Sequence, residues 1–323
     1  MRADWQPTAS TAMLKRRAAL LSRAREFFAE RGVLEVDTPL VINAPVTDVH
    51  IHSARVLFED TGSPSRRYFL HTSPEYAMKR LLAAGAGDIY QICHVIRSLD
   101  RGRLHNAEFT LIEWYRRGVS LDALMQEVAA LLRRLLAPAG AQRRTERISY
   151  REAFLRELAI DPFTVAEQAL AQAAHEAGLA AGAAGRDELL EFLMGTRIGP
   201  RLGRGTLTFV YGYPASQAAL ARLDAADPRA AERFELYCEG VELANGFHEL
   251  ADHRQQRARF EGDLAERRRR GLRAESLDER LLAALQAGLP DCCGVALGFE
   301  RTLMLATGAE RIDDVLPFPI ERA

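Results

Sequence analysis

The sequence has few cysteines and no long apolar run. Its four cysteines lack the Cys-x-x-Cys spacing of metal and redox motifs, and the adjacent pair Cys292-Cys293 is poorly placed to share a zinc ion, so buried reduced thiols are expected. No segment reaches the length of a membrane span, and the N-terminus lacks the apolar stretch of a signal peptide. These absences predict a soluble, cytoplasmic protein that does not enter a membrane.

Net charge is nearly absent as well, because 43 basic residues stand against 44 acidic ones in a chain of 323 residues. A chain with this balance has no general electrostatic attraction to nucleic acid. The only lysines are Lys15 and Lys79, so almost every basic residue is arginine. Together with the abundant alanine, this indicates a compositional bias rather than selection for guanidinium chemistry.

The pattern of apolar and turn-forming residues predicts an α+β fold, in which helices flank an antiparallel sheet. We expect one domain over residues 1–323, with a helical insertion at about 121–200 between the strands of the site. Helices are predicted at 11–31, with Leu14, Ala18, Leu21 and Phe28 on its apolar stripe, after Ser73-Pro74 up to Gly85, at 251–271 and at 277–287. Strands are predicted at 89–97, 109–116, 206–214 and 294–298.

An acidic hairpin at 234–250, FELYCEGVELANGFHEL, is the most informative segment, since it places Glu235, Glu242 and Glu249 seven residues apart. Glu239-Gly240 is typical of a two-residue turn between strands. The expected register pairs Cys238 with Val241, Tyr237 with Glu242 and Glu235 with Ala244.

In this register Glu235, Tyr237 and Glu242 share one face of the hairpin, above apolar residues on the other face. Like charges this close repel each other unless a cation lies between them, so the hairpin anticipates Mg²⁺ or a substrate ammonium group. Taken alone, a solvated acidic face would be the simpler interpretation.

Two further motifs suit a nucleotide. Alternation along 109–116 puts Phe109, Leu111, Glu113 and Tyr115 on one face, beside a loop that holds Arg97, Arg101, Arg103, His105 and Asn106. Guanidinium groups bind phosphate, and an aromatic ring stacks on a base. Taken alone, the segment is equally well interpreted as an ordinary surface hairpin with arginines in its loop. In GVALGFER, at 294–301, a glycine-rich strand lets a ligand approach and Arg301 follows in the first helical turn, which is a weak signal alone.

Taken together and in order, these motifs resemble those of class II aminoacyl-tRNA synthetases. RGVLEVDTPLV (31–41) is similar to the first motif of that class, which lies at a dimer interface, VIRSLDRGRLHNAEFTLIEWY (95–115) to the second and GVALGFERTLML (294–305) to the third. TSPEYAMKRLL (72–82) and ELANGFHELAD (242–252) narrow the resemblance to the lysyl-tRNA synthetases. It covers nearly the whole chain from residue 11.

The chain is expected to lack the N-terminal anticodon-binding barrel of lysyl-tRNA synthetases. In this it resembles the truncated ligases of that family that modify elongation factor P. The resemblance implies activation of (R)-β-lysine, or lysine, by ATP with Mg²⁺, and transfer to a lysine ε-amine of elongation factor P. It also implies a homodimer, and tRNA is not the expected partner.

The resemblance assigns roles to residues of this sequence. Arg97 would clamp the α-phosphate and Arg301 the γ-phosphate as the catalytic residues, because both tasks need a permanent forked charge. Phe109 would stack beneath adenine. The implied ATP site comprises Arg97, Asp100, Asn106, Phe109, Glu242, Leu243, Gly298 and Arg301, with Glu235 and Glu242 on the metal.

The implied amino-acid site has two ends. Glu113, Tyr115 and Glu249 would receive the terminal ammonium group of the substrate. The other amino group would lie near Ser73, Pro74 and Glu75, with Asn245 by the carboxylate and Ala296 in the wall of the pocket.

Two positions depart from the family pattern. The second motif usually reads Arg-x-Glu, but here Leu99 takes the place of the glutamate and only the shifted Asp100 could substitute for it. Loss of a charged hydrogen bond costs about 1.5–3 kcal/mol, which bears on ATP affinity rather than on the fold. Ala296 replaces the middle glycine of Gly-x-Gly-x-Gly, as in the β-lysine ligases.

Two alternatives remain at this stage. One is a stand-alone lysine-activating enzyme that uses tRNA or another acceptor, and the other is a non-catalytic synthetase-like binding or regulatory module. The sequence does not distinguish α-lysine from β-lysine, and it leaves open the number of magnesium ions and the surface that docks elongation factor P.

Overall fold

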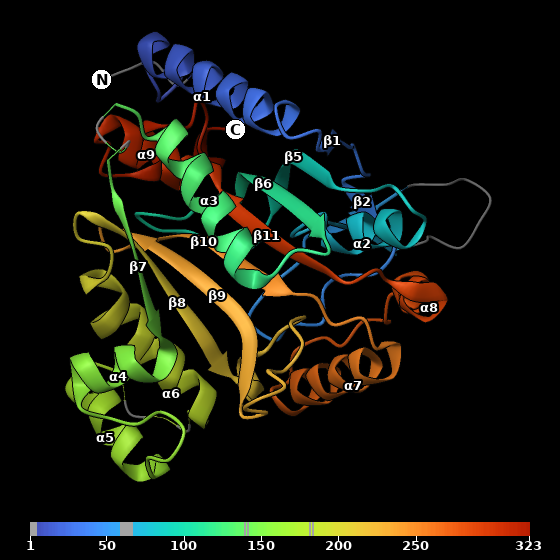
Figure 1. Ribbon diagram of the computed structural model, residues 1–323, viewed down its shortest axis with the longest axis vertical. Helices are drawn as coiled ribbons and strands as arrows, with labels where there is room; N and C mark the ends of the chain where they lie inside the picture. Colours follow the sequence, from blue (N-terminus) through green and yellow to red (C-terminus); the bar gives the residue numbers. More distant parts are fainter. Residues whose placement is uncertain (1–4, 59–66, 139, 141, 181, 183) are drawn as a thin grey trace.

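The computed structural model describes residues 5–58, 67–138, 140, 142–180, 182 and 184–323. Its centre is an eight-stranded sheet in the order β1-β5-β6-β11-β10-β9-β8-β7 (Figure 1). The strands are β1 (Leu34–Glu35), β5 (Ile89–Ile96), β6 (Glu108–Arg117), β7 (Arg144–Ser149), β8 (Thr206–Pro214), β9 (Ala230–Cys238), β10 (Val241–His248) and β11 (Cys292–Gly298). The six inner strands of this order, β5-β6-β11-β10-β9-β8, are antiparallel to their neighbours. At the two edges, β1 pairs with β5 and β7 with β8 in parallel.

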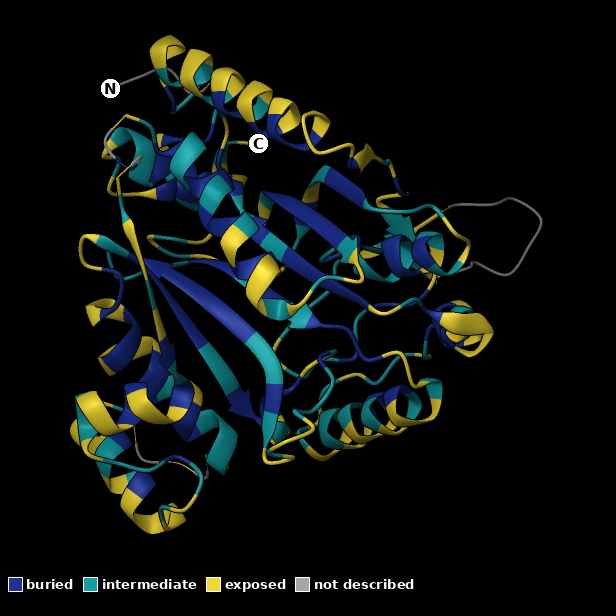
Figure 2. Cartoon of the chain, viewed as in Figure 1, coloured by how far each residue is buried: buried dark blue, intermediate teal, exposed yellow. Residues whose placement is uncertain are grey.

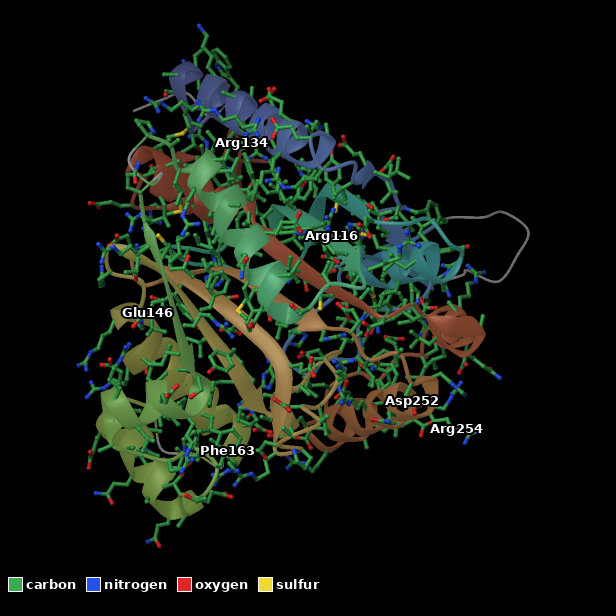
Figure 3. The ribbon with its side chains drawn as sticks, in the orientation of Figure 1. Arg116, Arg134, Glu146, Phe163, Asp252 and Arg254 are labelled. Carbon is green, nitrogen blue, oxygen red and sulfur yellow. The ribbon has the colours of Figure 1, made fainter. Side chains whose placement is uncertain are left out.

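Three helices pack on one face of this sheet: α1 (Thr11–Ala29), α3 (Leu121–Leu135) and α9 (Phe299–Thr307). They share an apolar core with the strands, in which the ring of Phe28 stacks on Tyr90 at 4.2 Å and meets Trp114 edge-on. Arg134 of α3 ties α1 to this layer through Glu30 at 2.6 Å and Glu26 at 3.1 Å (Figure 3). The opposite face of the sheet is therefore left for other elements and for the site.

A second group of elements borders that other face. It contains the three-stranded sheet β2 (Val41–Ile42), β4 (Arg67–Leu70) and β3 (Arg55–Leu57), and the helices α2 (Glu75–Ala83), α7 (His253–Arg269) and α8 (Glu279–Gly288). Asp252 caps α7 by accepting hydrogen bonds from the amides of Arg254 and Gln255. The predicted helices and strands outside 121–200 are confirmed, with most ends shifted by no more than two residues.

The predicted helical insertion at 121–200 is only partly helical. α3 belongs to the main core, and residues 144–149 form β7, which pairs with β8. Only α4 (Tyr150–Leu158), α5 (Glu167–Glu176) and α6 (Arg186–Leu193) build a separate apolar cluster, around Phe154 and Leu193. The strand was missed because its alternation is weak: at the sheet edge Ile148 is its only buried residue.

The apolar stripe predicted for the first helix is also shifted. α1 turns Arg17 inward, where the guanidinium donates to Glu300 at 2.7 Å, and Ala18 is exposed. Its buried residues are Leu20, Ala24, Phe27 and Phe28. Both phenylalanines therefore serve the core, while the outward side of α1 is exposed (Figure 2).

None of the described helices is long and apolar enough to span a bilayer.

Candidate active site

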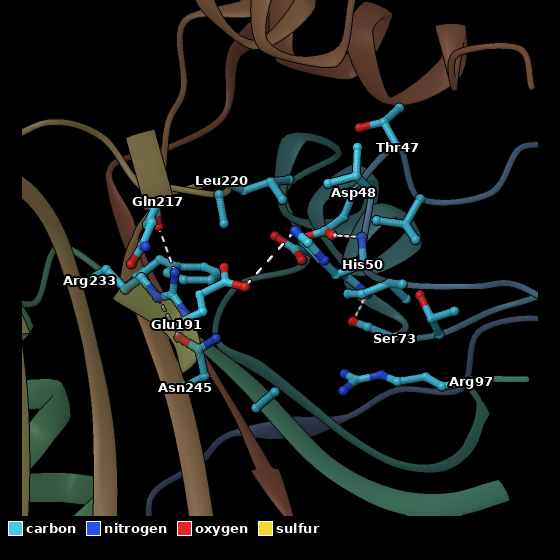
Figure 4. Close-up of a pocket in the computed structure, with 18 of the residues that line it drawn as sticks. Thr47, Asp48, His50, Ser73, Arg97, Glu191, Gln217, Leu220, Arg233 and Asn245 are labelled. Atoms are coloured by element: carbon cyan, nitrogen blue, oxygen red, sulfur yellow. Dashed lines mark hydrogen bonds and ion pairs between the residues drawn. The ribbon is translucent and has the colours of Figure 1, made fainter. Parts of the chain in front are cut away.

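A cavity of about 900 Å³ lies on the free face of the sheet. Its floor comes from β6, β10 and β11, and its walls from α2, α6, α7 and the loop at 46–51 (Figure 4). Most of the residues singled out in the sequence line it: Ser73, Glu75, Arg97, Asp100, Asn106, Phe109, Glu113, Tyr115, Glu242, Leu243, Asn245, Glu249, Ala296, Gly298 and Arg301. Pro74, which is buried at the start of α2, and Glu235 do not.

Strand register explains how these side chains meet. Glu113, Ala296, Asn245 and Glu235 lie opposite one another across β6, β11, β10 and β9. Phe109 precedes Glu113 by four residues on the same face of β6, about 13 Å at the rise of a strand. The floor thus has an aromatic end near Phe109 and an acidic end near Glu113.

The acidic hairpin forms with one correction. Glu239 and Gly240 both have positive φ, at 51° and 77°, as the predicted turn requires. The register shifts between Glu242 and Ala244, so Glu235 lies opposite Asn245 rather than Ala244. This bulge brings Asn245 to the cavity face, which strict alternation from Glu242 would not do.

At the aromatic end, Arg97 stands over the ring of Phe109, with 5.1 Å between the guanidinium carbon and the ring centroid. Its guanidinium has no hydrogen bond or ion pair with any described residue, and Nε is buried. Removal from water lowers the pKa of Arg97, and Asp100 and Glu242 oppose this. A half-buried, unpaired guanidinium beside an aromatic face suits an anion joined to a ring.

Arg301 closes the same end from α9. It donates to the backbone oxygen of Glu242 at 2.9 Å and lies 3.3 Å from the Glu242 carboxylate. It also contacts His105 Nε2 at 2.6 Å, and burial followed by the charge of Arg301 lowers the pKa of this imidazole. Neutral His105 can therefore accept a hydrogen bond from Arg301.

Asn106 makes structural hydrogen bonds at this end of the cavity, and Leu99 is exposed. Asn106 is buried, donates to Glu108 O at 2.7 Å and accepts from the Ile320 amide at 3.1 Å, so its amide holds the C-terminal segment in place. Leu99, where the family pattern has a glutamate, is 69% exposed. Asp100 does line the cavity, so the substitute carboxylate is in place.

At the acidic end, two carboxylates contact one amine and a third carboxylate lies near them. Lys79 Nζ lies 2.7 Å from Glu75 and 2.5 Å from Glu249, and it is fully buried. Glu113 accepts hydrogen bonds from Ser73 and from the Tyr115 hydroxyl, both at 2.8 Å. With all groups ionised the cluster carries a charge of −2, since three carboxylates face one ammonium group.

This excess of negative charge changes how the carboxyls titrate. Burial first, and then repulsion from Glu75, raises the pKa of Glu113 to about 7. Burial raises the pKa of Glu249 to about 8 despite Lys79 beside it. The neighbouring glutamates outweigh burial and raise the pKa of Lys79, so the cluster attracts further positive charge.

Glu242 and Glu235, the two residues expected to bind Mg²⁺, differ in whether their oxygens are already engaged. Glu242 faces the cavity, and burial together with the nearby Glu235 raises its pKa, which a bound cation would relieve. Both oxygens of Glu235 already accept hydrogen bonds, from Arg233 at 2.6 Å and Tyr237 at 2.7 Å. Among the described residues no group of three His, Cys, Asp or Glu side chains is arranged for a metal. Glu242 thus fits Mg²⁺ held mainly by phosphate oxygens and water, whereas Glu235 orients Arg233.

Sequence reasoning missed Lys79 and Arg233. Arg233 lines the cavity and donates to Asn245 Oδ1 at 3.3 Å and to Gln217 O at 2.6 Å. Lys79 carried a usable signal, because it is one of only two lysines and lies in the TSPEYAMKRLL segment. Arg233 carried none in this arginine-rich chain.

The sheet and cavity together define the catalytic domain of a class II synthetase. The family of class II tRNA synthetases (D, K and N) matches residues 3–322, and the chain belongs to this family.

Curated relatives are similar along their whole length. A Vibrio cholerae protein named elongation factor P–(R)-β-lysine ligase is 50% identical over 324 residues, covering 99% of both chains. Proteins of the same name from Salmonella arizonae and Proteus mirabilis are 48% identical over 325 residues, again with 99% of both chains covered. The resemblance inferred from the motifs is confirmed.

Proposed function

We propose that this protein is an ATP-dependent ligase that activates (R)-β-lysine, or lysine, as an adenylate and transfers it to a lysine ε-amine of elongation factor P. The observation that carries the proposal is the charge of the cavity. Its acidic end lacks two positive charges, and a diamino acid brings two ammonium groups. Its other end holds the unpaired Arg97 beside Phe109, as ATP requires.

In this proposal the amino acid lies along β6, β10 and β11. Glu113, Tyr115 and Glu249 receive its terminal ammonium group, Ser73 and Glu75 lie near the other amino group, and Asn245 lies by the carboxylate. Ala296, between Glu113 and Asn245 in the register, forms the pocket floor. Lys79 bridges Glu75 and Glu249 and offsets one of the three negative charges, so that two remain for the substrate.

ATP lies at the aromatic end, with adenine on Phe109, the α-phosphate on Arg97 and the γ-phosphate on Arg301. Mg²⁺ would neutralise charge on the phosphates, with Glu242 as its protein ligand and Glu235 behind it. The substrate carboxylate attacks the α-phosphorus and pyrophosphate leaves, so no side chain need act as a nucleophile. Positioning and charge neutralisation then supply the catalysis.

Amino-acid-dependent ATP–pyrophosphate exchange tests this proposal. Exchange is expected with β-lysine and lysine, and the comparison of the two isomers identifies the preferred one. Norleucine, which lacks the terminal ammonium group, should support little exchange because Glu113 and Glu249 would stay uncompensated. Equal exchange with norleucine, or none with any amino acid, would overturn the assignment of the acidic end.

A further inference from the structure

The outer side of the cavity holds a carboxylate that the activation step does not use. Glu191 of α6 faces the loop at 46–51, where His50 Nε2 lies 3.9 Å from its Oε2 (Figure 4). The amide of His50 in turn donates to Asp48 Oδ1 at 2.7 Å. These three residues line the cavity and join two elements that are far apart in the sequence.

The loop that carries His50 is held firmly against α7. Thr47 Oγ1 donates to Asp263 at 2.6 Å, and Arg267 donates to the backbone oxygens of Asp48 at 2.6 Å and Ile51 at 3.4 Å. Arg267 therefore anchors this loop rather than only facing solvent. The loop is anchored to α7, and α6 is tied to Arg270 through Glu188. The separation of His50 and Glu191 is therefore built into the fold.

Glu191 differs from the other carboxylates on this side of the cavity. Asp187 accepts from Ser216 at 2.7 Å, Glu188 caps α6 and pairs with Arg270, and Glu266 binds Arg269 and Arg270. The Glu191 carboxylate accepts no hydrogen bond from any described residue, its one ion-pair contact is the distant His50, and its side chain is 51% exposed. It is the carboxylate on this wall that an incoming group can reach and use.

Transfer to an amine poses a problem that activation does not. An acceptor lysine is protonated at neutral pH, since its ordinary pKa is about 10.4, and only the free amine attacks a carbonyl. We propose that Glu191 binds the ammonium group of the acceptor lysine and takes its proton, and that His50 positions the Glu191 carboxylate. This inference rests on the proposed function, because it assumes an amine acceptor and an acyl-adenylate.

The step balances without any further reactant. The ammonium group gives one proton to Glu191, and the freed lone pair of the nitrogen attacks the carbonyl carbon of the adenylate. The bond from that carbon to the phosphate oxygen then breaks, and its electron pair leaves with AMP. The nitrogen loses its second proton to solvent, which leaves an amide.

The surroundings of Glu191 suit this role. Partial removal from water raises the pKa of Glu191, and the nearby Asp48 and Asp187 raise it further, whereas His50 and Arg233 lower it. A base whose pKa lies nearer to neutrality accepts a proton and gives it up again more readily. Arg233, whose charge acts on Glu191, also donates to Asn245, the residue assigned to the substrate carboxylate, so one guanidinium links Glu191 to that part of the cavity.

The variant Glu191→Gln tests the inference when the two half-reactions are measured separately. Pyrophosphate exchange should stay within about twofold of wild type. Single-turnover transfer from preformed adenylate to elongation factor P at pH 7 should fall roughly 100-fold, the lower end of what a general base contributes. Transfer should recover as the pH approaches the pKa of the acceptor lysine, because the free amine then forms without a base.

Hydroxylamine separates proton removal from other defects, since it is largely unprotonated at neutral pH and needs no base. Glu191→Gln should transfer to hydroxylamine at the wild-type rate. Loss of transfer to both acceptors, or normal transfer to elongation factor P, would overturn the inference. If the wild type itself fails to exchange or to transfer, the proposed function fails instead.

Two more variants complete the design. Glu188→Gln makes the same charge change one turn away, on a carboxylate that is already paired, and should leave the pH profile of transfer unchanged. His50→Asn should move the rising limb of that profile to higher pH, because His50 lowers the pKa of Glu191. An unmoved limb would mean that His50 does not position this carboxylate.

Discussion

At the residue scale, Glu242 lies between the two ends of the cavity. It faces the cavity beside Arg301, and Glu235 lies behind it on the neighbouring strand. The charges of Arg301, Arg233 and Arg97 do not neutralise it fully, since the pKa of Glu242 stays above its ordinary value. An additional cation would therefore be stabilised at this position.

Glu242→Gln should abolish most adenylate formation while the fold stays intact, because one charged ligand is lost and no bulk is added. The pyrophosphate exchange rate should fall about a hundredfold or more. Glu146→Gln is the matched control, since Glu146 lies on the edge strand β7 away from the cavity (Figure 3). Near-normal exchange in Glu242→Gln would mean that the metal is misplaced.

How far single residues could be predicted depends on how locally their roles are set. Glu113 and Phe109 follow from alternation along one strand and Glu242 from one turn, and all three line the cavity. Lys79 acts through Glu249, 170 residues later in the sequence, and Arg233 through hydrogen bonds to Asn245 and Gln217, which are 12 and 16 residues away. Glu235 was expected beside the metal, and in the structure both of its oxygens accept hydrogen bonds, from Arg233 and Tyr237.

At the element scale, β11 is the strand on which the amino-acid pocket most depends. It lies between β6 and β10, with Gly294 opposite Tyr115 and Ala296 opposite Glu113. A Cβ at Gly294 would collide with the Tyr115 ring and with Glu249 Oε1. Glycine is thus required here by close approach rather than by backbone angles.

Gly294→Ala should raise the KM for the amino acid at least tenfold and leave the KM for ATP nearly unchanged. The methyl group displaces Tyr115 and Glu249 but does not reach Arg97 or Phe109. Overpacking should also cost about 1–3 kcal/mol of unfolding free energy, measurable by denaturant titration. Gly195→Ala is the control, since no atom lies within 4 Å of its added Cβ; a normal KM in Gly294→Ala would contradict the placement of the substrate.

Elements with a strong period were predictable, and irregular ones were not. β5, β6 and β8 are rich in β-branched and aromatic residues and lie at the expected positions. β7 and the bulge in β10 went unrecognised, because a short edge strand buries few residues and a bulge changes register without a sequence signal. The bulge matters most, since it alone brings Asn245 to the cavity.

At the scale of the whole molecule, the buried acidic cluster links stability to pH. The pKa of Glu113 is about 7 and that of Glu249 about 8, both above the ordinary 4.5. Between about pH 4.5 and pH 7–8 the folded state therefore binds more protons than the unfolded state. This contribution is present in full below about pH 4.5 and is lost as the pH rises through 7 and 8.

The melting temperature should accordingly fall between about pH 5.5 and 8.5, and saturating β-lysine should reduce the fall by supplying positive charge. Glu249→Gln should flatten the slope relative to wild type, because one of the two titrating groups is gone. Thermal denaturation followed over this pH range makes the comparison. A slope that is unchanged in the variant would contradict the buried-cluster assignment.

A homodimer is expected on the same scale. β1 ends the sheet on one side, and Leu34 and Leu40 around it are 55% and 40% exposed. The exposed side of α1 lies next to this edge (Figure 2). Sedimentation at micromolar concentration should therefore give twice the chain mass of 35.9 kDa, and a single species at the monomer mass would contradict this expectation.

The most direct test of the proposed ligase reaction is mass spectrometry of the acceptor. Purified protein, ATP, Mg²⁺ and labelled (R)-β-lysine are incubated with elongation factor P and with tRNA in parallel. We expect elongation factor P to gain one β-lysyl group on a lysine side chain, and tRNA to stay unlabelled. Label on tRNA, or adenylate formed without any gain of mass on elongation factor P, would contradict the proposed function.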